Sequence, residues 1–121
     1  MVMSLRERSK TTILIQPENP FMEEMKDVLA CMFWRNPELS DPALKFLEMI
    51  RENNGLKDSY WSEFCRINNI TRGQYDSIIS KLRGGGFIYK RNDVWKISEG
   101  FEEFLEKIVE ITKKWRGKNE K

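Results

Sequence analysis

Three consecutive glycines, Gly84–Gly86, constrain this sequence more than any other feature, because they separate a helical pattern from two β patterns. Before them, T-R-G-Q-Y-D-S-I-I-S-K-L-R starts at Thr71, a good helix-capping residue. Its apolar residues have the i, i+3, i+4, i+7 spacing of one helix face: Tyr75, Ile78, Ile79 and Leu82. After the glycines, F-I-Y-K and V-W-K-I have the composition of strands. The segment therefore predicts a helix over 71–83 followed by a β-hairpin.

Glycine-rich stretches can also cradle phosphate, so the role of Gly84–Gly86 has to be decided. A phosphate-binding loop leads from a strand into a helix N-terminus and carries Gly-Lys-Ser/Thr. Here the glycines follow a helix, at its electronegative end, where glycine supplies the left-handed conformation that ends helices. We interpret them as the joint between helix and hairpin.

The hairpin turn falls at residues 91–93, Arg-Asn-Asp. Asn and Asp tolerate the positive φ that a tight hairpin turn needs. With Asn92 and Asp93 as the central residues, two cross-strand pairs are predicted: Ile88 with Ile97, and Lys90 with Trp95. We expect Trp95 to fill core space, because its strand must bury one face.

Four further helices are predicted. One spans 20–35, with the 3.6-residue period of a buried helix. A second has Asp41 as its N-cap and Pro42 at its first position, and Gly55 closes it. A short third helix covers 59–66 and a last one covers 99–115. Residues 1–19 form an arm or short strand, and 117–121 a frayed tail.

Composition indicates a folded chain: at 121 residues it suits a single domain over 20–116, with a core at 42–98. Charged residues are 33% and hydrophobic ones 40%, which argues against extensive disorder. No apolar run is long enough for a membrane span, and the start lacks a secretion signal. We expect a cytoplasmic protein without a membrane partner.

The residues that usually perform catalysis are scarce. Histidine is absent, which removes the commonest general base and metal ligand. Cys31 and Cys65 lie far apart in apolar segments and resemble buried thiols more than a disulfide or metal site. We therefore expect no enzymatic activity, no metal and no cofactor.

Positive charge is concentrated around the glycine joint. The net charge of the chain is only +2, yet residues 64–98 carry seven basic and two acidic residues. Residues 17–63, by contrast, carry five basic and ten acidic ones. Such segregation is typical of a surface that binds a polyanion.

The order of helices, hairpin and final helix matches a winged helix-turn-helix domain. The stretch I-T-R-G-Q-Y-D-S-I-I-S-K-L-R-G-G-G-F-I-Y-K resembles the recognition helix and first wing strand of MarR-like bacterial and archaeal regulators, with Leu82, Gly86 and the pair 87–88 at the matching positions. V-W-K-I-S is similar to the second wing strand. The resemblance covers residues 42–98. It implies a mostly α fold with a small β-hairpin wing and extra N-terminal and C-terminal helices.

The resemblance also implies which residues contact DNA. Helix 71–83 would enter the major groove, where Arg can read guanine and Gln can read adenine, and the wing tip at 90–92 would contact phosphates or the minor groove. The implied DNA-binding residues are Thr71, Arg72, Gln74, Ser77, Lys81, Lys90, Arg91 and Asn92. Gly73 and Ser80 also face outward, while Lys57 and Tyr60 are weaker candidates. The alternative is that the helix residues are ordinary solvated side chains.

Asp76 is out of place on such a face, because a carboxylate repels phosphate. It either accepts a hydrogen bond from cytosine or pairs with Arg72 one helical turn earlier. Its orientation decides between the two.

Two functions follow from this interpretation. The first is a sequence-specific double-stranded DNA-binding regulator, acting as a homodimer through helices 20–35 and 99–115, since both are rich in Phe, Met and Trp. Alternatively these helices cover the core of their own chain. The second function is a winged-helix protein interaction module in transcription or replication machinery.

Overall fold

The computed structural model describes residues 22–119, which form five α-helices, two short 3-10 helices and three strands. The expected arm at 1–19 lies outside the described residues. The α-helices are α2 (Met25–Met32), α3 (Ser40–Asn53), α4 (Trp61–Asn68), α5 (Arg72–Gly84) and α6 (Gly100–Asn119). The 3-10 helices are η1 (Pro37–Leu39) and η2 (Asp58–Tyr60), and the strands are β1 (Leu56–Lys57), β2 (Ile88–Arg91) and β3 (Val94–Ile97).

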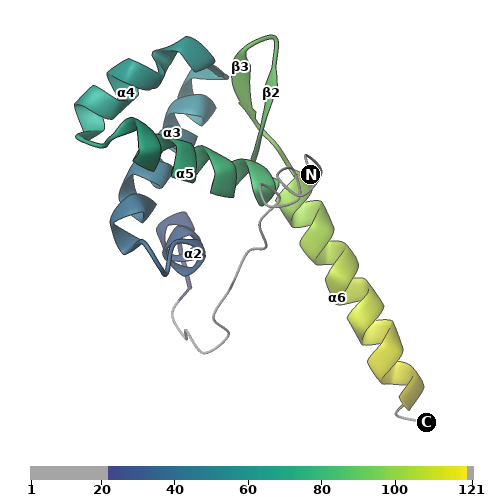
Figure 1. The fold of residues 1–121 in the computed structure, drawn as a ribbon. Coiled ribbons are helices and arrows are strands. Elements are labelled where there is room, and N and C mark those ends of the chain that lie inside the picture. The colour runs from purple at the N-terminus through teal and green to yellow at the C-terminus, as the bar shows by residue number, and fades with distance from the viewer. Residues whose placement is uncertain (1–21, 120–121) are drawn as a thin grey trace, which may run out of the picture.

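The architecture is mostly helical with a small antiparallel sheet, and its element order is compatible with a winged-helix layout. In Figure 1, helices α2 to α5 form one body with the β2–β3 hairpin beside them, while α6 runs away from that body. Every described helix is too short or too polar to cross a membrane.

Helix α2 is shorter than the predicted span of 20–35. It starts at Met25 because the Asp27 carboxylate accepts the backbone N–H groups of Glu23 and Glu24, each at 3.0 Å. These bonds lower the pKa of Asp27 and close the first turn of the helix. Its buried residues Leu29 and Met32 face the core, so this helix covers its own chain.

The predicted start of the next helix is wrong. Asp41 is not its N-cap and Pro42 is not its first residue, because α3 begins at Ser40, directly after η1. Proline is tolerated there because the first N–H groups of a helix have no intrahelical partner. The helix ends at Asn53 and is capped by Asn54 in the left-handed conformation, and Gly55 follows with its N–H donated to the Ile50 carbonyl.

The hairpin has the predicted register, since Ile88 pairs with Ile97 and Lys90 with Trp95. Its turn places Asn92 and Asp93 at φ values of 55° and 62°, as a two-residue hairpin turn requires. The sheet has a third strand that sequence patterns missed, because β1 is only two residues long and pairs with β3.

The core is built around Phe46 of α3, which is fully buried. Its ring meets Phe64, Tyr75 and Trp95 edge-on, with centroids 5.3, 5.9 and 6.4 Å away. One ring therefore holds α4, α5 and β3 together, and truncating it to Ala would cost about 3 to 5 kcal/mol. Cys31 and Cys65 are both buried, as predicted.

Among residues 22–119, the contacts that attach helix α6 to the body lie at its start. The Phe101 N–H donates to the Gly86 carbonyl at 3.0 Å, and the Phe101 ring stacks on Phe87 at 4.2 Å. Its backbone stays helical to Asn119, beyond the expected end at Trp115 and into the expected frayed tail. Lys and Arg residues in the last turns favour this extension, since they face the negative end of the helix dipole.

Candidate nucleic-acid interface

The N-terminus of α5 is closed by a reciprocal pair of hydrogen bonds. The Gln74 N–H donates to the Thr71 hydroxyl at 3.0 Å, and the Thr71 N–H donates to the Gln74 side-chain oxygen at 2.9 Å. This is a capping box, which satisfies two N–H groups that a helix start leaves open. The capping box uses the side-chain oxygen of Gln74, and recognition of adenine by Gln74 would need the same oxygen as hydrogen-bond acceptor.

The outer face of α5 is exposed over its whole length. Exposed positions along this face have helical spacing and mostly small side chains: Gly73, Asp76, Ser77, Ser80 and Gly84. A shallow polar hollow of about 340 Å³ lies along it, lined by Asn36, Asp76, Ser77, Ser80 and Lys81. Another macromolecule could therefore approach the backbone of this helix closely.

Arg72 lies along the helix at one end of this face. Its guanidinium sits over the Trp61 ring of α4, 4.0 Å from the centroid, and its Nε donates to Asp76 at 3.1 Å. Both side chains of the ion pair remain more than half exposed, at 54% and 60%. The structure thus selects the ion pair among the two alternatives for Asp76, and this pair leaves the local charge balanced.

Lys81 is turned toward the body. Its ammonium donates to the Met32 carbonyl at the end of α2, at 3.1 Å, and lies 5.7 Å from the Phe33 ring. Burial lowers its pKa, and the nearby Arg35 charge lowers it further. Lys81 therefore links α5 to the end of α2, and its ammonium is less available to bind a phosphate of DNA.

The hairpin tip carries the other predicted cluster. Arg91 and Asn92 are exposed at the turn. Lys90 is held lower on the strand, 3.4 Å from the Asp58 carboxylate and 5.1 Å from the Trp95 ring. The same carboxylate accepts the Trp95 indole N–H at 3.1 Å, so Asp58 anchors the hairpin to η2.

Arg83 connects the two parts of the candidate interface and was missed by the sequence analysis. It is exposed on the last turn of α5, and its guanidinium lies 5.6 Å from the Trp95 ring that Lys90 also approaches. It follows Arg72 by eleven residues, about three turns, so helical spacing alone could have found it. Asn36, from the segment after α2, could not be found that way.

Burial and internal bonding sort the predicted site residues. Thr71, Arg72, Ser77, Lys90, Arg91 and Asn92 are exposed, whereas Gln74 and Lys81 are partly buried. Side-chain hydrogen bonds within the chain are made by Thr71, Arg72, Gln74, Lys81 and Lys90. Of the weaker candidates, Lys57 is exposed and Tyr60 packs partly against the core.

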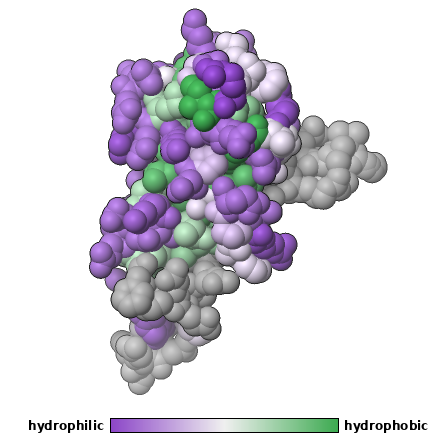
Figure 2. Space-filling view, turned by 90° about the vertical axis from the view of Figure 1, so that its left-hand side faces the viewer, coloured by the Kyte–Doolittle hydropathy of each residue, from purple (hydrophilic) through white to green (hydrophobic). Residues whose placement is uncertain are grey.

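Within residues 22–119, no three acidic, cysteine or histidine side chains gather in a way that could hold a metal ion. Figure 2, turned to face the left of Figure 1, shows mostly hydrophilic surface with small separate apolar areas.

Comparison with known proteins gives a family but no function. No curated protein and no solved structure matches the chain. A model described as an archaeal family matches residues 18–118, which is most of the sequence. The chain therefore belongs to this archaeal family.

Proposed function

We propose that this protein binds double-stranded DNA sequence-specifically, as a winged helix-turn-helix regulator of transcription similar to the MarR type. Helix α5 would lie in the major groove and the β2–β3 turn would contact the backbone. The observation that carries the proposal is the exposed outer face of α5, with small side chains along it and Arg72 and Arg83 beside it.

The geometry changes the roles that we assign to individual residues. Ser77 and Ser80 are exposed on the outer face of α5 and line its polar hollow, so they are the proposed base-edge or phosphate contacts. Arg72 would read a guanine after leaving Asp76, a half-exposed ion pair that costs little to break. Gln74 is assigned to capping α5, because its oxygen already accepts the Thr71 N–H.

The hairpin would supply affinity without sequence preference. Arg91 and Lys90 can each neutralise a phosphate. Each such contact steepens the slope of log binding constant against log salt concentration by about 1. Arg83 would extend this positive edge onto α5, next to Trp95.

The test starts with selection of preferred duplexes from a random pool, followed by binding titrations at several salt concentrations. Arg72→Lys keeps the charge but loses the two-pronged donor geometry, so it should relax preference at one base pair and leave the salt slope unchanged. Lys90→Ala with Arg91→Ala should weaken binding to every sequence and reduce the salt slope by about 2.

A matched control removes the same charge elsewhere. Lys26→Ala with Lys45→Ala changes two exposed lysines on α2 and α3. This variant should bind nearly as well as the parent. Equal losses in the two double variants would mean that net charge alone drives binding, and they would contradict the proposal, as would a failure of the selection to enrich any sequence.

A second function is favoured by a different observation, the exposed apolar side chains of α6. Phe104, Ile111 and Trp115 are 64%, 58% and 66% exposed, which suits a protein-binding surface. A winged-helix interaction module would show DNA affinity that is independent of sequence, together with a stable complex with a different protein.

A further inference from the structure

The apolar side chains on α6 follow a heptad pattern. Phe101, Phe104, Ile108, Ile111 and Trp115 are separated alternately by three and four residues, which is the a and d spacing of a coiled coil. From Phe104 onward these positions are 42% to 66% exposed. The row is about 21 Å long, and its shape suits the side of another helix.

The charges on α6 favour one orientation for that second helix. Residues 99–106 contain four acidic residues and no basic one, whereas residues 107–116 contain four basic residues and one acidic. Two copies of α6 packed in parallel would set like charges against each other. Packed antiparallel, each acidic half faces a basic half, and the helix dipoles also oppose favourably.

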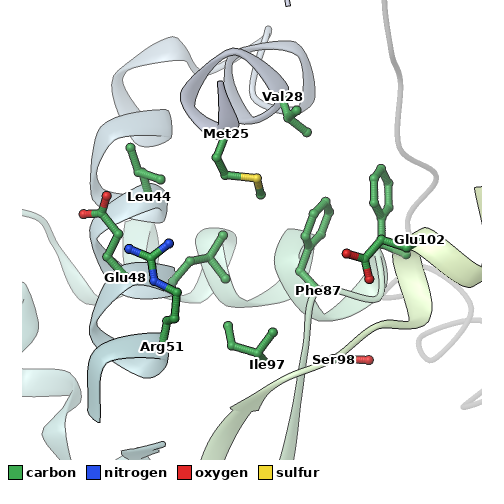
Figure 3. Close-up of a pocket in the computed structure, with 11 residues that line it drawn as sticks. Met25, Val28, Leu44, Glu48, Arg51, Phe87, Ile97, Ser98 and Glu102 are labelled. Atoms are coloured by element: carbon green, nitrogen blue, oxygen red, sulfur yellow. The ribbon is translucent and has the colours of Figure 1, made fainter. Parts of the chain in front are cut away.

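The row continues onto the body through Phe101. This ring lines an apolar groove of about 460 Å³ between α2, α3, the base of the hairpin and the start of α6. Figure 3 shows Met25, Val28, Phe87 and Ile97 directed into this groove, with Glu48, Arg51 and Glu102 at its edge. In an antiparallel pair, the basic last turns of the partner helix reach this end of α6. They would then meet the apolar groove and, at its rim, the Glu48 and Glu102 carboxylates with the Arg51 guanidinium beside Glu48.

We propose that two copies of this chain associate through an antiparallel pair of α6 helices, with the partner's last turns covering the groove beside Phe101. α2 contributes its groove-lining side chains, Met25 and Val28, whereas Leu29, Cys31 and Met32 are buried in its own core. The proposal does not depend on DNA binding, so the two can fail separately.

Cysteine cross-linking of the full-length chain tests the orientation. In an antiparallel pair, position 104 of one chain lies near position 115 of the other, and neither position lies near its own copy. A mixture of Phe104→Cys and Trp115→Cys chains should give the mixed disulfide in clear excess under mild oxidation. Each variant alone should stay uncross-linked. Efficient cross-linking of either variant with itself indicates parallel helices and overturns the proposal.

Sedimentation analysis of two neighbouring variants tests the surface. Ile108→Asp places a charge on the heptad row, whereas Val109→Asp makes the same change at a half-exposed position off the row. We expect the parent and Val109→Asp to be dimers, and Ile108→Asp to raise the dissociation constant by about tenfold or more. Both positions are exposed, so circular dichroism should show folded chains.

Two outcomes overturn the proposal. One is a parent chain that stays monomeric at the highest concentration measured, including the case in which α6 instead captures a different protein. The other is equal weakening by the two variants, which would mean that the heptad row is not the contact surface.

Discussion

At the residue scale, Thr71 determines how α5 begins, because its hydroxyl accepts the Gln74 N–H while its own N–H donates to the Gln74 side chain. Replacing Thr71 by Ala removes the accepting hydroxyl. We expect this change to lower the free energy of unfolding by about 1 kcal/mol, measured by urea denaturation followed by tryptophan fluorescence. Thr71→Ser keeps the hydroxyl and should stay within about 0.5 kcal/mol of the parent. Equal losses of unfolding free energy for the two variants would show that the hydrogen bond to the Thr71 hydroxyl does not stabilise the protein.

The buried phenol of Tyr75 makes the free energy of unfolding depend on pH in the alkaline range. Burial raises its pKa from 10.0 to about 12, and the nearby Asp58 charge adds to the shift. The folded state therefore keeps the phenol proton that the unfolded state releases, so this contribution to stability is complete below pH 10 and is lost as the pH rises to about 12. The free energy of unfolding should fall by about 2 kcal/mol through this titration.

Tyr75→Phe removes this titration. The free energy of unfolding of the variant should fall less steeply than that of the parent between pH 10 and 12, as measured by urea denaturation at each pH. The comparison cancels the other groups that titrate in this range. Parallel pH curves for the two proteins would contradict the assignment.

At the element scale, Gly86 is the point where α5, β2 and α6 meet. Its φ is +85°, and a Cβ at this position would lie 2.9 Å from the backbone nitrogen of Phe101. Side chains rarely adopt such a conformation, and the close atom belongs to the backbone, so it cannot move aside cheaply. The glycine joint that the sequence predicted is also the docking point of the last helix.

Gly86→Ala should therefore lower the free energy of unfolding by about 3 kcal/mol, measured by urea denaturation. Gly85→Ala is the matched control, because Gly85 has a φ of −84° that any residue adopts. This control should change stability by less than about 1 kcal/mol. A mild effect at Gly86 would mean that the start of α6 can shift away from the joint.

At the scale of the whole molecule, α6 extends away from a body that is complete without most of its length (Figure 1). All side chains described from Glu106 onward are exposed, and the buried cluster is supplied by α2 to β3 with Phe101 packed against it. The distal half of α6 therefore adds little to the folding of a single chain.

Ending the chain after Glu106 tests this division. At low protein concentration the truncated chain should retain the stability of the parent within about 1 kcal/mol. The melting temperature of the parent should rise with protein concentration if α6 pairs with a second copy, while that of the truncated chain should not. An unfolded truncated chain would show that distal α6 supports its own body.

Local sequence was sufficient for several parts of the fold. The N-cap at Thr71, the inward set of α5, the positive-φ turn at Asn92 and Asp93, and the hairpin register were all predicted correctly. Each depends on neighbours within a few residues or on the periods of helix and strand, which the sequence displays directly.

Only the tertiary structure decided how the candidate interface is composed. Lys81 is drawn inward by a carbonyl 49 residues earlier in the chain, and Lys90 by a carboxylate 32 residues earlier. Strand β1 exists because β3 lies beside it, and the heptad row of α6 stays exposed from Phe104 onward because the core closes without these side chains. Side-chain partners and exposed surfaces depend on which distant segments come within a few ångströms, and periodicity along one chain carries no record of that.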